Sequence, residues 1–126
     1  MKIQFDKHGY PTEESLEYVR KFPLTADRKK IEELLRDIME AWMYSDRAQE
    51  KNGLWVFSTG GWSGNEDLLS ALFSSPLWNS LAWNSISLSG GFLAIATTKD
   101  TQTKLAEKGA YFVRWAWKLD TKPEKS

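Results

Sequence analysis

The residues most suited to chemistry lie in the segment Ser58-Thr59-Gly60-Gly61-Trp62-Ser63-Gly64-Asn65-Glu66. Ser63 could act as a nucleophile, and the carboxylate of Glu66 could exchange protons with a substrate. A serine hydrolase also needs an imidazole base, and the single histidine, His8, falls in a polar turn near the N-terminus. The nucleophile elbow G-x-S-x-G is not matched either, because Gly64 comes one residue early. We therefore predict no complete catalytic site.

The same segment lacks the features of a phosphate, metal or cofactor site. A phosphate loop would read G-x-x-x-x-G-K-S/T, and the glycines between residues 60 and 64 have neither that spacing nor a lysine. Glu66 and Asp67 would repel a phosphate, and adjacent side chains on a helix diverge, so helix capping explains this pair better. The chain has no cysteine, which excludes thiol catalysis and cysteine-based zinc sites. We expect no cofactor and no metal.

Two interpretations of residues 60–66 stay open. In the first, the glycines form a strand-to-helix turn, and Ser63 and Glu66 cap the next helix as a capping box. In the second, the loop presents Trp62, which stands between small residues, to a binding partner. The binding site would then comprise Trp62, Ser63, Gly64, Asn65 and Glu66. The other tryptophans expected in the core are Trp42, Trp55 and Trp83.

Length and composition indicate one domain that must position this segment. The chain has 126 residues, of which 41% are hydrophobic and 27% are charged, values typical of a single globular domain over residues 1–126. Residues 53–98 contain only two charged side chains, so this middle third should form the interior. Residues 121–126 have nothing apolar to dock and should fray.

The periodicity of apolar residues predicts both helices and strands. Thr12 should cap a first helix, and a longer helix should begin near Thr25 or Asp27 and end at Asn52-Gly53. A strand is expected over 54–59 and a hairpin over 86–97 that turns at Gly90-Gly91. Further helices are expected from Ser63, from Ser75-Pro76 and over about 100–108, and a last strand over 111–119. These elements predict an α+β fold with a small, mainly antiparallel sheet and helices packed on one face.

Charge and hydropathy also limit the possible partners. The formal net charge is zero, so nucleic acid is an unlikely partner. A local basic stripe in the C-terminal part keeps it as an alternative: Lys99, Lys104, Lys108, Arg114 and Lys118. Charge follows the first methionine too soon for a signal peptide, and no apolar run could span a bilayer, so we expect a cytoplasmic protein with no membrane contact.

The block from Ser58 to Glu66 resembles a group of small phage and prophage proteins of unknown function. The similarity extends from about residue 5 to 97 and includes the opening Gly-Tyr-Pro-Thr-Glu-Glu-Ser-Leu-Glu at 9–17 and the glycines at 90–91. The family tends to read Arg-Arg-Gly-Gly-His-Tyr where this chain has Leu88-Ser89-Gly90-Gly91-Phe92-Leu93, so the arginines and the histidine are missing here. The resemblance implies a phage-linked accessory role and brings no established activity.

The sequence thus favours a non-enzymatic protein-binding module, and the resemblance favours a phage or mobile-element accessory protein that acts on a host or viral protein. One alternative is a small-molecule-binding or hydrolytic domain that uses residues 60–66. A second alternative is a nucleic-acid binder that uses the C-terminal basic residues. Neither the partner nor the oligomeric state follows from the sequence.

Overall fold

A four-stranded antiparallel sheet lies at the centre of the computed structural model, which describes residues 3–43, 47–89 and 91–120, with side chains as far as residue 116. The strand order is β1-β2-β4-β3, with β1 (Ala48–Lys51), β2 (Leu54–Ser58), β3 (Ser85–Leu88) and β4 (Phe92–Ala96). The predicted strand over 54–59 and the hairpin over 86–97 are therefore confirmed, although Gly90 lies outside the described residues.

The two inner strands are buried on both faces, which explains their unbroken apolar sequences. On β2, Trp55 and Phe57 point into one hydrophobic cluster, whereas Leu54 and Val56 point into another. This alternation follows from the two-residue period of a strand. The sheet therefore separates two cores, and each core needs its own cover of helices.

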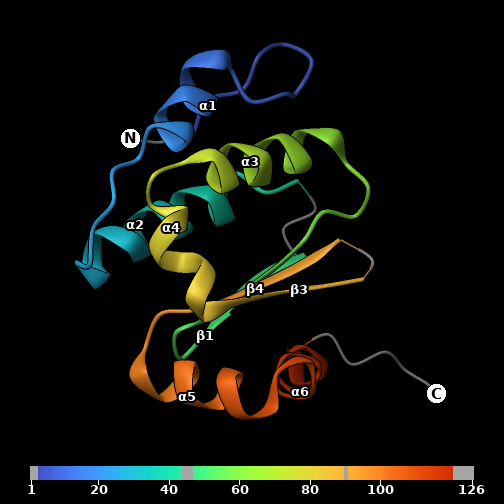
Figure 1. Cartoon of the computed structure of the whole chain (residues 1–126). Coiled ribbons are helices and arrows are strands. Elements are labelled where there is room, and N and C mark those ends of the chain that lie inside the picture. The colour runs from blue at the N-terminus through green and yellow to red at the C-terminus, as the bar shows by residue number, and fades with distance from the viewer. Residues whose placement is uncertain (1–2, 44–46, 90, 121–126) are drawn as a thin grey trace, which may run out of the picture.

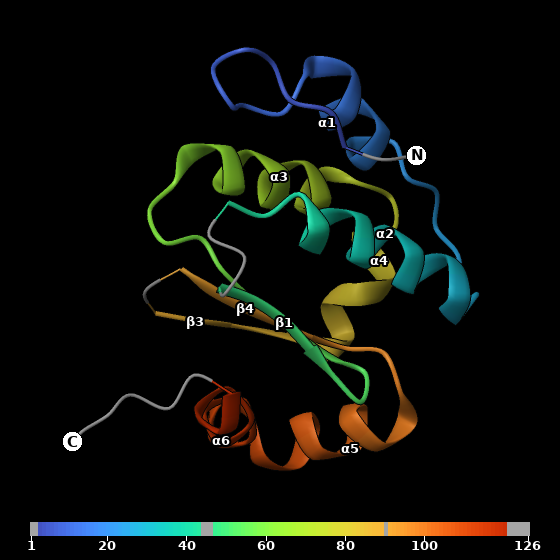
Figure 2. The ribbon, with the colours of Figure 1, turned by 180° about the vertical axis from the view of Figure 1, so that it is seen from behind.

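Helices cover both faces of the sheet (Figures 1 and 2). The larger core lies under α1 (Glu13–Arg20), α2 (Arg28–Glu40), α3 (Ser63–Ser74) and α4 (Trp78–Leu81), which continues into a 3₁₀ helix, η2 (Ala82–Asn84). The smaller core lies under α5 (Lys99–Lys108) and α6 (Ala110–Asp120). The predicted α+β fold is confirmed, but helices pack on both faces rather than on one.

The local signals at several helix ends act as predicted. Thr12 caps α1 by accepting a hydrogen bond from the backbone N–H of Ser15, and Asp27 caps α2 by accepting from that of Lys29. Gly109 follows the last residue of α5 with a positive φ. The helix expected at Ser75-Pro76 begins at Trp78, two residues after the proline.

Three further predictions about the fold are wrong. The segment 111–119, expected as a strand, belongs to helix α6. Because α6 packs on the second face of the sheet, this error also explains why helices were expected on one face only. Helix α2 ends at Glu40 rather than at Asn52-Gly53, which instead forms the positive-φ turn of the β1–β2 hairpin. Trp83, expected in the core, is 87% exposed. The predicted frayed tail, 121–126, lies outside the described residues.

Among the described residues, no helix is long and apolar enough to cross a membrane.

Candidate functional site

The predicted capping box at the start of α3 does not form. Trp62 occupies the N-cap position and no side chain caps the helix. Because the helix begins one residue earlier than expected, Ser63 is its first residue and Glu66 lies one position beyond the place that a capping box requires. The Ser63 hydroxyl instead donates to the Tyr10 hydroxyl at 3.5 Å, and Glu66 is exposed.

Asn65, the most buried polar residue of the predicted site, has a structural task. It is 1% exposed. Its Oδ1 accepts from the backbone N–H of Met43 at 3.0 Å, and its Nδ2 donates to the carbonyl oxygens of Met43 at 3.1 Å and of Thr59 at 3.2 Å. One side chain therefore ties the residues after α2, the end of β2 and the start of α3 together.

Trp62 neither enters the core nor projects freely. Its indole stacks on Tyr10, with ring centroids 5.1 Å apart and planes inclined by 18°. It also folds back over the new helix, because a Cβ atom added at Gly64 would lie only 2.6 Å from the indole Nε1. Gly64 is therefore the residue that lets the ring lie close to α3.

The loop that carries Tyr10 is held by Asp6. The Asp6 carboxylate accepts from the backbone N–H groups of His8 at 2.8 Å and of Tyr10 at 3.0 Å, and the Asp6 N–H donates to the Tyr10 carbonyl. The hydrogen bond from the Tyr10 N–H is the largest cause of the lowered pKa of Asp6. The partner ring of Trp62 is thus fixed by its own turn.

Together these loops form an exposed surface at one end of the molecule, which we call the aromatic tip. Figures 1 and 2 show the loops before α1 and before α3 at this same end. Tyr10 and Met43 are each 37% exposed, and Trp62 is half-buried. The aromatic tip comprises Tyr10, Met43, Trp62 and Ser63.

The aromatic tip offers exposed aromatic and hydroxyl groups for contact. Among the hydrogen bonds of the described residues, that of the Ser63 hydroxyl is with the Tyr10 hydroxyl and not with an imidazole or a carboxylate. Four surface hollows of about 110 to 270 Å³ are lined by other residues, none from 60–66. In the described part of the chain, no group of three or more His, Cys, Asp or Glu side chains could hold a metal ion.

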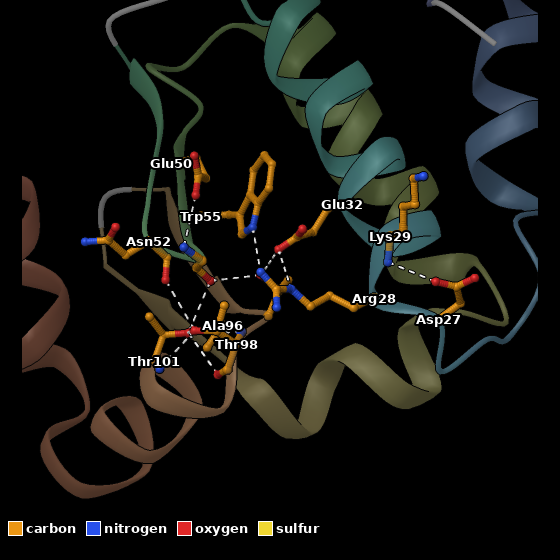
Figure 3. Close-up of polar contacts among 12 residues, drawn as sticks. Asp27, Arg28, Lys29, Glu32, Glu50, Asn52, Trp55, Ala96, Thr98 and Thr101 are labelled. Carbon is orange, nitrogen blue, oxygen red and sulfur yellow. Dashed lines mark hydrogen bonds and ion pairs between the residues drawn. The ribbon is translucent and has the colours of Figure 1, made fainter.

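A polar network links α2 to the strand ends (Figure 3). The spacing of its residues in the sequence does not reveal it. The Thr97 hydroxyl donates to Glu32 Oε2 at 2.6 Å and accepts from the Trp55 indole N–H at 3.1 Å, across 65 and 42 residues of sequence. Arg28 Nε lies 3.2 Å from the same Glu32 oxygen. A hollow of about 170 Å³ adjoins this network. Because its polar groups bind one another, we interpret it as a cross-link between α2 and the sheet.

A second surface missed by the sequence analysis is the outer side of α6, here called the α6 face. Tyr111 is 72% and Trp115 is 55% exposed, one helical turn apart, with the exposed Arg114 beside them. The predicted basic stripe included Arg114 on a strand, whereas the structure places it on this helix. Reading 111–119 with a helical period would have revealed the face.

Comparisons of the chain with protein-family models, with curated proteins and with solved structures find no match.

Proposed function

We propose that the chain is a non-enzymatic protein-binding module whose aromatic tip contacts the partner. The observation that carries this proposal is the stack of Trp62 on Tyr10, because it joins two large rings from loops 52 residues apart into one exposed surface. Trp and Tyr are the residues most often found at the energetic centre of protein interfaces. Met43, whose backbone is bound by Asn65 in the first turn of α3, adds an exposed and adaptable apolar side chain.

The rigidity of the aromatic tip supports this proposal. Asn65 fixes the loop under Trp62 through three hydrogen bonds, and Asp6 fixes the turn under Tyr10. A surface that is ordered before binding loses less conformational entropy on association, and the saving appears as affinity. The partner that fits has a shallow apolar pocket for the two rings and a polar rim that meets Ser63 and Glu66.

The resemblance to phage proteins and the cysteine-free composition suggest where the chain binds its partner. We propose a phage or mobile-element accessory protein that occupies a host or viral protein in the cytoplasm. A chain that acts by occupying its target needs stable contact surface and no catalytic group, which matches the chemistry of the aromatic tip.

Affinity capture with matched variants tests this proposal. The parent chain, Trp62→Ala and Trp115→Ala would each be immobilised and exposed to lysate of the organism that carries the gene. Proteins that bind through the aromatic tip should be retained by the parent and by Trp115→Ala, and lost with Trp62→Ala. A partner lost with Trp115→Ala alone would move the site to the α6 face, and a partner retained by both variants would contradict both sites.

The α6 face favours a second candidate function, the binding of single-stranded nucleic acid. Tyr111 and Trp115 could stack on bases while Arg114 contacts a phosphate. A fluorescent oligonucleotide of mixed sequence would test it, because binding through phosphates weakens steeply as salt rises and should disappear with Trp115→Ala. Salt-independent binding, or none, would contradict this second candidate.

A further inference from the structure

The two edges of the sheet differ in how well they are protected. Strand β1, at one edge, carries Glu50 and Lys51, and Arg36 approaches Glu50 to 3.9 Å. Charged side chains are the usual means by which an edge strand avoids pairing with another chain. Strand β3, at the opposite edge, reads Ser85-Ile86-Ser87-Leu88 and has neither a charge nor a proline. The edge formed by β3 therefore lacks the protection that β1 has.

The outer side of β3 is also uncovered by the described elements. Figure 1 views the sheet from the side of β3, and the described helices lie above and below that strand rather than along its outer side. Ile86 and Leu88 pack on the smaller core yet stay partly exposed, and Ser87 is exposed. Beside Leu88, a hollow of about 120 Å³ is lined by Leu88, Ser89, Phe92 and Arg114. The edge thus offers open backbone groups flanked by incompletely covered apolar side chains.

We propose that β3 pairs antiparallel with β3 of a second copy of this chain, so that the two sheets join across a two-fold axis. Side chains alternate between the faces of a sheet, so the register must keep Ile86 and Leu88 on the α6 side in both copies. Of the registers that do this, the one centred on Ser87 pairs both apolar residues of the strand with apolar residues of the other copy. Ser87 then lies opposite its own copy, and Ile86 lies opposite Leu88 of the other chain.

This register is why a second copy fits better than an unrelated strand. Each apolar residue meets an apolar residue and each serine meets a serine, both favourable cross-strand pairs. The strand has no charge, so the two-fold axis brings no like charges into opposition within the ladder. The symmetric contact also closes on itself, because it uses the uncharged edge of the described sheet and leaves the charged β1 edges outside.

A charge exchange at Ser87 tests the pairing. Sedimentation velocity of the parent should show a concentration-dependent species of twice the chain mass. Ser87→Lys and Ser87→Glu each place like charges opposite one another and should weaken the dimer about tenfold or more. An equimolar mixture of the two variants should restore the dimer, because lysine then faces glutamate. Ser70→Lys, at an exposed position on α3, should leave the parent's association unchanged.

Hydrogen exchange on the parent gives a readout that needs no variant. The backbone amides of β3 should exchange more slowly as protein concentration rises, whereas those of β1 should not change. A parent that stays monomeric up to about 1 mM overturns the proposal. So does a dimer that survives Ser87→Lys, or a Lys and Glu mixture that fails to pair. Melting curves show whether both Ser87 variants remain folded.

Discussion

The side-chain amide of Asn65 forms hydrogen bonds with both backbone polar groups of Met43. It accepts from the Met43 N–H at 3.0 Å and donates to the Met43 carbonyl at 3.1 Å. A side-chain amide that pairs with both the N–H and the carbonyl of one residue replaces the partner that a strand would provide. Met43 follows α2, and Asn65 lies in the first turn of α3. This contact therefore sets the position of the loop that carries the aromatic tip.

Removing this amide should destabilise the protein. Asn65→Ala leaves the Met43 backbone and the Thr59 carbonyl without their partner in a buried place, so we expect the free energy of unfolding to fall by about 2–4 kcal/mol. Asn79→Ala, at an exposed position on α4, should change it by less than about 0.5 kcal/mol. Urea denaturation measures both, and equal small losses would contradict the structural task of Asn65.

The capping interactions predict losses of stability of different size at two hydroxyl residues. Thr98 caps α5 in a capping box with Thr101, and it also donates to the Asn52 carbonyl at 3.2 Å. Thr98→Ala should therefore lower the unfolding free energy by about 1–2 kcal/mol. Ser63→Ala should lower it by less than about 0.5 kcal/mol, because Ser63 does not cap α3. Thermal melts would contradict this assignment if Ser63→Ala proved the more harmful change.

Two glycines with similar φ values should respond differently to alanine. Gly9 and Gly53 have φ values of +86° and +93°, so either substitution should cost about 1–2 kcal/mol in backbone strain. A Cβ atom at Gly9 meets open space, whereas one at Gly53 would lie 2.3 Å from Thr98 Cγ2. Gly53→Ala should therefore be worse than Gly9→Ala by a further 1–3 kcal/mol or so. Equal melting temperatures would show that the β1–β2 turn can move away from Thr98.

The errors of the sequence analysis have physical causes that individual residues show. The segment 111–119 is rich in aromatic and β-branched residues and alternates in polarity, which favours a strand. The structure buries Phe112, Val113 and Ala116, which is a helical spacing that the same letters contain. Tertiary contact with the second face of the sheet decides between the two periods, and no local signal does so.

Other features differ in how far the sequence could predict them. The Asn52-Gly53 pair is the strongest short-range hairpin signal, and it could have revealed β1 despite the polar sequence Ala-Gln-Glu-Lys. By contrast, the bond between Thr97 and Glu32 joins residues that only the finished fold brings together. The aromatic tip is an intermediate case. The small neighbours of Trp62 indicate that its loop could present the ring to a partner, but no feature of the sequence indicates its stack on Tyr10.

The pH dependence of stability should show the environment of Tyr18. Burial is the main cause that raises the pKa of this phenol to about 12, and the Asp37 carboxylate, which accepts its hydrogen bond at 3.2 Å, adds to it. Because the pKa of Tyr18 is higher in the folded state than in the unfolded state, Tyr18 contributes to the free energy of unfolding. This contribution is complete below about pH 10 and is lost as pH rises toward 12. Tyr18→Phe should lose stability less steeply over that interval in alkaline denaturation. Parallel curves for the two proteins would contradict this.

The decisive prediction concerns Trp62, which is more exposed than a core residue and less exposed than a residue that projects freely into solvent. Truncation of a fully buried aromatic such as Trp55 should cost about 3–5 kcal/mol. Trp62→Ala loses the stack on Tyr10 and part of its burial, so we expect about 1–2 kcal/mol. The domain should stay folded, which allows binding to be measured on the variant.

If the aromatic tip is the interface, Trp62→Ala should weaken partner binding by about 2 kcal/mol or more, which is about thirtyfold in Kd. Tyr10→Ala should weaken it too, and the double variant should lose less than the sum of the two, because each ring positions the other. Trp83→Ala, which removes a more exposed ring elsewhere, should leave the affinity unchanged. Additive losses at Tyr10 and Trp62, or an equal loss at Trp83, would show that the stacked pair is not the unit that the partner recognises.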